Sequence, residues 1–153
     1  MRKLCRNIAI AMSVGLTAAC TSINCQLNNT VYTTYGFYTG DKQAITITDT
    51  LTVTAAGTDS VLLNRQANAG SMELPMSYTG NTDMLILHFD NLGNDTLWVD
   101  HTNYPYYETP ECGTAIFHNI TRIGHTNNHI DSIVIVKPSV NYDGLENVRI
   151  FFK

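Results

Sequence analysis

The setting of one cysteine, Cys20, predicts a chemical modification. A basic head comes first, then an uncharged apolar stretch, then small residues and a cysteine (Arg2, Lys3 and Arg6; residues 8–16; Ala18 and Ala19; Cys20). The apolar stretch is about nine residues long, whereas a helix that spans a bilayer needs roughly 20. This order is typical of a secretory signal. We therefore expect the chain to be exported.

The segment Leu16-Thr17-Ala18-Ala19-Cys20 resembles the lipobox of bacterial lipoproteins. The resemblance implies cleavage after residue 19 and acylation of Cys20. Acyl chains partition at about 0.8 kcal/mol per buried CH₂, so several chains would hold the protein on a membrane. Two alternatives remain open: the Ala18-Ala19 pair also suits an ordinary signal peptidase, which would release a soluble protein, and the signal could stay uncleaved.

Processing at Cys20 leaves two cysteines for pairing. Cys5 is lost with the signal and Cys20 becomes a thioether, so Cys25 and Cys112 remain in an oxidising compartment. We predict a disulfide between them. It would close a loop of close to 90 residues, for which the chain-entropy description gives about 4–5 kcal/mol. The alternative is two free thiols.

A tripeptide of aspartate, a hydroxyl residue and an aliphatic residue occurs four times. Its copies are Asp49-Thr50-Leu51, Asp59-Ser60-Val61, Asp95-Thr96-Leu97 and Asp131-Ser132-Ile133. The pattern indicates strand entry, because the aspartate caps a turn and the following residues begin the ladder. It also resembles the O-glycosylation motif of exported Bacteroidetes proteins, which implies Thr50, Ser60, Thr96 and Ser132 as acceptors.

The remaining chemistry-bearing residues predict neither a metal site nor catalysis. Four histidines lie late in the chain (His101, His118, His125 and His129), but their spacing fits no zinc pattern. Residues 90–95 lack the length and terminal glutamate of an EF-hand loop and predict a hairpin turn instead. Motifs for a hydrolase nucleophile or a phosphate loop are absent. We expect no cofactor and no enzyme activity. A hydrolase is the third hypothesis for the function, after the two binding roles described below.

Aromatic residues gather at Tyr104-Pro105-Tyr106-Tyr107, ahead of Cys112. Tyrosines in an exposed loop offer a large contact area with a polar tip, so Tyr104, Tyr106 and Tyr107 could contact a glycan or a small ligand. The alternative is a rigid loop that closes one end of the fold and is stapled by Cys112.

Short stretches with strand character, separated by turn residues, fill the rest of the chain. They are residues 31–38, 45–53, 60–64, 73–76, 84–89, 95–99, 114–123, 130–137 and 147–153. Residues 45–53 alternate apolar and hydroxyl side chains, Pro75 indicates an edge or crossing segment, and residues 84–89 are apolar on both faces. Residues 84–99 form the clearest hairpin candidate. We predict an antiparallel β-sandwich of about eight or nine strands, immunoglobulin-like in general shape.

Several landmarks resemble those of a family of small Bacteroidetes envelope lipoproteins of unknown function. They are Cys25, Leu74-Pro75, Asp83-Met84-Leu85, Cys112-Gly113, Ile130-Asp131-Ser132-Ile133 and Ile150-Phe151-Phe152. The resemblance implies an envelope location and a β-rich domain, and it carries no activity. Surface-exported lipoproteins of the Bacteroidetes have an acidic stretch after the lipidated cysteine, and Thr21-Ser22-Ile23-Asn24 does not resemble it. We therefore expect a position on the periplasm-facing side of the outer membrane.

Length and charge complete the prediction. Residues 1–19 form the signal, 20–24 a short tether that reaches at most about 17 Å, and 25–153 a single domain. Cleavage leaves six basic and 13 acidic residues, a net charge of about −7, which argues against nucleic acid as a partner. We predict a non-catalytic, lipid-anchored envelope protein that interacts with another envelope protein. The alternative is a glycan- or small-ligand-binding lipoprotein that uses residues 104–107.

Overall fold

The computed structural model describes residue 25, residues 30–58 and residues 60–153, and this part of the chain contains strands and no helix. The predicted signal, Cys20 and the tether lie outside the described residues. The ten strands are β1 Tyr32–Thr39, β2 Leu51–Ala55, β3 Val61–Gln66, β4 Ser71–Pro75, β5 Thr82–Phe89, β6 Gly93–Tyr107, β7 Thr114–His125, β8 Ile130–Ile135, β9 Ser139–Val140 and β10 Glu146–Phe152. No helix that could cross a bilayer is found in the described part.

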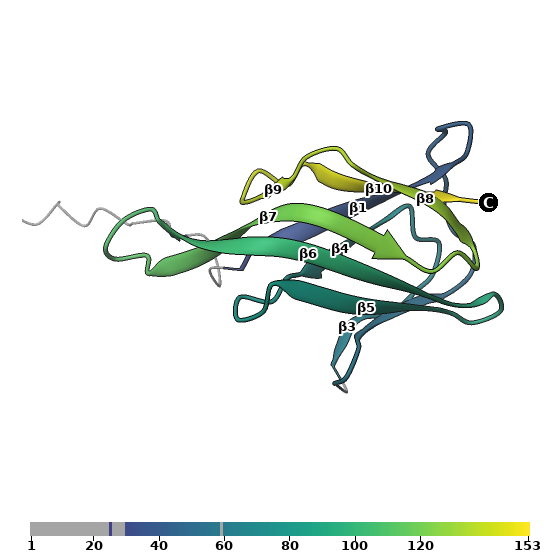
Figure 1. Cartoon of the computed structure of the whole chain (residues 1–153), viewed down its shortest axis with the longest axis horizontal. Coiled ribbons are helices and arrows are strands. Elements are labelled where there is room, and N and C mark those ends of the chain that lie inside the picture. Colours follow the sequence, from purple (N-terminus) through teal and green to yellow (C-terminus); the bar gives the residue numbers. More distant parts are fainter. Residues whose placement is uncertain (1–24, 26–29, 59) are drawn as a thin grey trace, which may run out of the picture.

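Two sheets pack face to face, which confirms the predicted sandwich (Figure 1). One sheet has the strand order β4-β1-β10-β8, and the other has the order β3-β2-β5-β6-β7-β9. The core between them is made of the inward-facing alternate residues of both sheets, including Tyr35, Phe37, Leu51, Val53, Leu87, Leu97, Val99, Val148 and Ile150. This is the arrangement that period-2 patterning predicts.

One pair departs from the antiparallel prediction, because β1 and β10 run parallel, with Tyr35 opposite Val148 and Phe37 opposite Ile150. These strands are the first and last of the fold, so the whole intervening chain serves as their connection. The β5–β6 hairpin is confirmed, with Phe89 paired to Gly93. Pro75 ends β4, which is an edge strand as predicted.

The secondary structure of two segments differs from the prediction. β2 begins only at Leu51, whereas the segment 44–50 holds just two isolated bridges, one of which pairs Ile47 with Ala69. Ile45 donates to the carbonyl of Phe37 in one sheet before the chain enters the other at β2, so this segment crosses between the sheets. At the other end of the molecule, Tyr104–Tyr107 belongs to β6 and is not a loop.

The tyrosine segment stays in the sheet because β6 and β7 form an arm that extends beyond β5. The first residue of β5, Thr82, pairs with Asp100, and β6 continues to Tyr107 with β7 alone as its neighbour. Proline is tolerated at the edge of a sheet, where its missing N–H faces no partner strand. Pro105 therefore does not end the strand, and the turn falls later, at residues 108–113.

Candidate functional site

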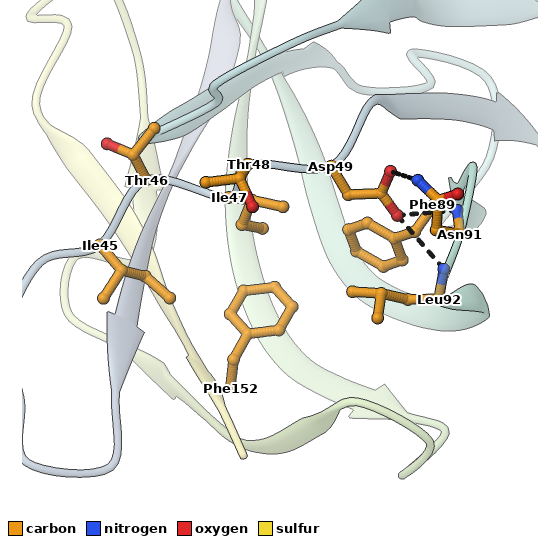
Figure 2. Close-up of a pocket in the computed structure, with 9 residues that line it drawn as sticks. All are labelled: Ile45, Thr46, Ile47, Thr48, Asp49, Phe89, Asn91, Leu92 and Phe152. Carbon is orange, nitrogen blue, oxygen red and sulfur yellow. Dashed lines mark hydrogen bonds between the residues drawn. The ribbon is translucent and has the colours of Figure 1, made fainter.

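An open apolar pocket of about 400 Å³ lies where the crossing segment meets the ends of two strands (Figure 2). Its walls come from the crossing segment, the β5–β6 turn and the end of β10; the apolar lining side chains are Ile45, Ile47, Phe89, Leu92 and Phe152. The rings of Phe89 and Phe152 meet edge to face at 6.1 Å. Its volume lies within the range of small ligand sites.

Asp49 fixes the pocket's outer wall. Its carboxylate accepts hydrogen bonds from the backbone N–H groups of Asn91 (2.9 Å) and Leu92 (3.2 Å), which belong to the β5–β6 turn. The Asn91 backbone bond is the main reason that the pKa of Asp49 lies below its usual range. Asp49 is therefore ionised at neutral pH, and it ties the crossing segment to a turn about 40 residues later in the sequence.

The crossing segment presents a free backbone edge beside the pocket. Ile45 and Ile47 direct their N–H groups to Phe37 and Ala69. Thr46 and Thr48 are exposed, and their backbone groups have no hydrogen-bond partner among residues 30–58 and 60–153. An extended segment with unpaired backbone groups beside an apolar pocket is the arrangement that binds an added strand, whose side chain fills the pocket.

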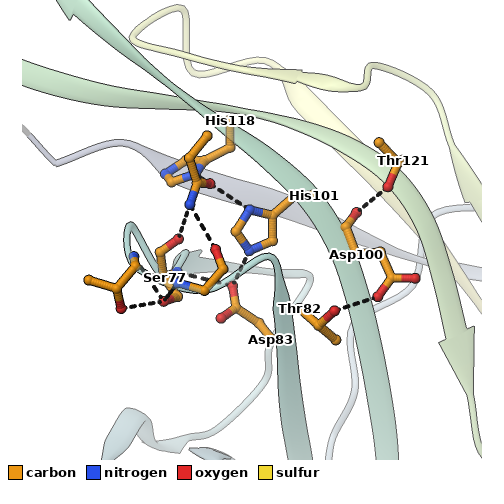
Figure 3. A network of polar contacts seen from close by, with 10 residues as sticks. Ser77, Thr82, Asp83, Asp100, His101, His118 and Thr121 are labelled. Carbon is orange, nitrogen blue, oxygen red and sulfur yellow. Dashed lines mark hydrogen bonds and ion pairs between the residues drawn. The ribbon is translucent and has the colours of Figure 1, made fainter.

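A polar network contains the buried His101 and His118 (Figure 3), and Asn103 joins these two side chains. The Asn103 amide nitrogen donates to the backbone carbonyls of Ser77 (3.2 Å) and Gly80 (2.7 Å), which fixes the orientation of the amide. Its oxygen lies 2.7 Å from Nδ1 of both His101 and His118. Because the oxygen can only accept, each Nδ1 carries a proton.

This network could suggest catalysis, because Asp83 Oδ2 lies 3.2 Å from Nε2 of His101. The His101 side chain is completely buried, however. The neighbouring hydroxyl of Ser77 is held by the backbone N–H of Gly80 at 2.9 Å. The geometry therefore fits a device that fastens the β4–β5 connection to β6 and β7. Among the described residues, no group of three or more histidine, cysteine, aspartate or glutamate side chains could hold a metal ion.

His118 adds a neutral acceptor to a second cavity. Burial, together with the nearby His101, lowers the pKa of His118 to about 4. With its proton on Nδ1, His118 has a lone pair on Nε2. His118 helps to line a cavity of about 310 Å³ with Val31, Met76 and Ile116. Sequence reasoning could not find this setting, because it depends on Asn103, which is two residues from one histidine and 15 from the other.

The predicted tyrosine site is an aromatic cluster on the β6–β7 arm. The ring of Tyr106 stacks on Phe117 at 4.3 Å, and Tyr104 meets the same ring edge to face at 6.0 Å. Tyr142, after β9, packs against Phe117 at 5.1 Å. Tyr107 is 69% exposed, the largest exposed fraction among the three tyrosines predicted to contact a ligand. Much of the area of Tyr104 and Tyr106 is used in packing.

The structure joins Cys25 to Cys112, with the two Cα atoms 5.2 Å apart. This link ties the start of the described chain to the β6–β7 turn. That turn lies at the end of the molecule opposite the C-terminus, as Figure 1 shows. The pocket includes Phe152, next to that C-terminus. The disulfide and the pocket are therefore at opposite ends of the sandwich.

The four hydroxyls predicted as glycosylation acceptors differ in exposure. Ser60 and Ser132 are exposed, whereas Thr50 and Thr96 are partly buried. Two aspartates of these tripeptides, Asp49 and Asp95, cap turns, and both turns are distant in the sequence. Of the four hydroxyls, Ser60 and Ser132 are thus the ones with open access.

Comparison with known proteins gives one match. A protein family described as a family of unknown function (DUF6452) matches residues 50–152. No curated protein and no solved structure shows significant similarity to the chain. The matched range includes Cys112 and nine of the ten strands, and it begins at the last residue of the crossing segment, Thr50.

Proposed function

Because the chain belongs to this family of unknown function, we propose its role from its own geometry. It is a non-catalytic, lipid-anchored protein of the bacterial envelope that binds an extended segment of a partner protein. The observation that carries this proposal is the apolar pocket beside the free backbone of Thr46 and Thr48. The partner's backbone would pair with these residues, and one apolar side chain would enter the pocket.

The lipid anchor in this proposal is Cys20, five residues before a cysteine that is fastened to the domain. The anchor holds the β6–β7 end near the periplasm-facing side of the outer membrane and leaves the pocket uncovered. We expect palmitate supplied to growing cells to label the chain but not its Cys20→Ala variant. Labelling of both to the same extent would contradict the anchor.

A purified-protein assay tests the pocket. Peptides selected from a random display library should share a large apolar residue within an extended stretch. Leu92→Glu should weaken their binding at least tenfold, because burial of one apolar side chain contributes about 1.5–3 kcal/mol and 1.4 kcal/mol corresponds to a factor of ten. Leu92 lines the pocket and is 53% exposed, so the fold tolerates its replacement.

The matched control is Leu145→Glu. Leu145 is 59% exposed and lies outside the pocket lining. The Leu145→Glu substitution should leave the dissociation constant of the selected peptides unchanged. A selection that yields no binder, or binders that both substitutions weaken equally, would overturn the proposed function.

The second candidate is binding of a glycan or small ligand by the aromatic cluster, favoured by the exposure of Tyr107 and, less, of Tyr104. Aromatic faces stack on apolar faces of sugars. Glycan-array binding that Tyr107→Ala abolishes and Leu92→Glu preserves would favour this candidate over the first.

A further inference from the structure

The second cavity, which His118 helps to line, is formed by residues from both sheets. Val31 lies just before β1, and Pro75 ends β4; these strands belong to the four-stranded sheet. The remaining wall comes from β7, which belongs to the six-stranded sheet. The volume of about 310 Å³ is enough for a small ligand. This cavity shares no lining residue with the pocket beside the crossing segment.

The wall from β7 is built of alternate residues of one strand. Thr114, Ile116 and His118 are two residues apart in turn, so their side chains point to the same side of the sheet. Thr114 is exposed and Ile116 is half-buried, whereas only 3% of His118 is exposed. The cavity thus runs inward along β7 and reaches a buried imidazole.

One nitrogen of this imidazole has no partner. Nδ1 of His118 donates to the amide oxygen of Asn103 at 2.7 Å. Nε2 forms no hydrogen bond with residues 30–58 or 60–153. It is not sealed inside the protein as Nε2 of His101 is, so it can be reached from the cavity. A buried acceptor without a partner is costly, and it therefore points to a molecule that donates to it.

The rest of the lining is uncharged and mainly apolar. Val31 and Met76 are buried, and thioether sulfurs such as that of Met76 pack favourably against aromatic rings. Burial, together with the nearby His101, keeps the pKa of His118 at about 4, so its ring is neutral at pH 7. Among the described residues that line the cavity, none then carries a charge. A carboxylate would meet a lone pair and no cation, whereas a hydroxyl group can donate to Nε2.

We propose that this cavity binds an uncharged aromatic molecule with one hydroxyl group. The hydroxyl donates to Nε2 of His118, and the ring lies against Met76 and Ile116. This site is separate from the proposed partner-binding pocket and does not depend on it. The simplest probe with these properties is 4-methylphenol. Toluene has the same ring without the donor, and 4-methylbenzoate has a negative charge in place of the donor.

An NMR titration of the purified, ¹⁵N-labelled full chain at pH 7 tests the site. We expect 4-methylphenol to shift the backbone amides of Met76 and of residues 114–118 in a saturable way. It should bind about three- to tenfold more tightly than toluene, the factor that one net hydrogen bond contributes. We expect no saturable shift with 4-methylbenzoate. No saturable binding of 4-methylphenol, which would leave a cavity for water only, or equal affinities for the three probes would overturn the proposal.

The acceptor itself is tested with His118→Asn. The asparagine amide keeps a donor near the position of Nδ1, toward Asn103, and removes Nε2. In this variant 4-methylphenol should bind no more tightly than toluene, and a preserved preference would contradict the role of Nε2. A second readout needs no variant: the ¹⁵N resonance of Nε2 in the wild type should move with 4-methylphenol and stay in place with toluene. A resonance that responds equally to both would also contradict it.

Filling the cavity tests its location. Ile116→Phe adds a ring beside His118 and should weaken the binding of both 4-methylphenol and toluene by about tenfold or more. The matched control is Ile86→Phe, because Ile86 is partly buried on β5 and lines neither cavity. This control should bind both probes as the wild type does. Equal affinities of the two variants for 4-methylphenol would contradict a site at His118.

Discussion

Replacing Asp95 with alanine is expected to lower the free energy of unfolding by about 3–5 kcal/mol, because four donors lose their acceptor and each buried donor left unsatisfied costs about 1–3 kcal/mol. Asp95 is 1% exposed. Its carboxylate accepts from the hydroxyl of Thr126 (2.6 Å) and from the backbone N–H groups of Asn128, His129 and Ile130 (3.0, 2.8 and 3.2 Å). It thereby holds the whole β7–β8 turn, and urea unfolding at pH 7 measures the effect.

The same contacts make the stabilisation that Asp95 contributes depend on pH, and the direction of this dependence follows from the pKa shift of its carboxyl group. Burial by itself raises the pKa of Asp95, but the hydrogen bonds from Thr126 and the turn outweigh it and leave the pKa below its usual range. The unfolded value is about 3.9. The stabilisation is therefore fully present above about pH 4 and is lost as the pH falls through the folded-state pKa.

Asp41→Ala is the matched control for this substitution. Asp41 is exposed in the turn after β1. Its replacement should change stability by no more than about 0.5 kcal/mol. A loss below about 1 kcal/mol for Asp95→Ala would show that the β7–β8 turn does not depend on the carboxylate.

Removal of the Cys25–Cys112 disulfide is the second large effect. The two cysteines are 87 residues apart, and closing a loop of that length corresponds to about 4–5 kcal/mol in the chain-entropy description. The double variant Cys25→Ser/Cys112→Ser should unfold at correspondingly lower urea concentration. Dithiothreitol should destabilise the wild type by a similar amount and leave the double variant unchanged. A wild type whose stability is insensitive to reduction would contradict the pairing.

The alternation of apolar and polar residues, together with the turn residues, predicted the parts of the fold that depend on residues close in the sequence. The hairpin of β5 and β6 followed from the turn at 90–94, and the sandwich followed from the regular spacing of strands. The prediction for residues 84–89 was only partly right. β5 is central in its sheet, but Met84 is 41% exposed on a face that the other sheet does not cover.

What the sequence could not predict is which distant segments meet. Alternation in residues 45–53 indicated a strand, yet Ile45 and Ile47 form a pocket wall because the chain changes sheets there. The aspartate of a strand-entry tripeptide indicated a cap, but not that Asp95 caps a turn more than 30 residues away. The parallel pairing of β1 with β10 likewise leaves no local signal, since each strand has the same alternation in either orientation.

The pocket can be tested most directly in intact cells, with a photoreactive amino acid at position 92 of the lipid-anchored chain. Irradiation is expected to join position 92 to an extended segment of one envelope protein, with an apolar residue at the junction when the product is analysed by mass spectrometry. The same probe at position 145 should give no such product. Equal products from both positions, or none from position 92, would contradict a partner-binding pocket.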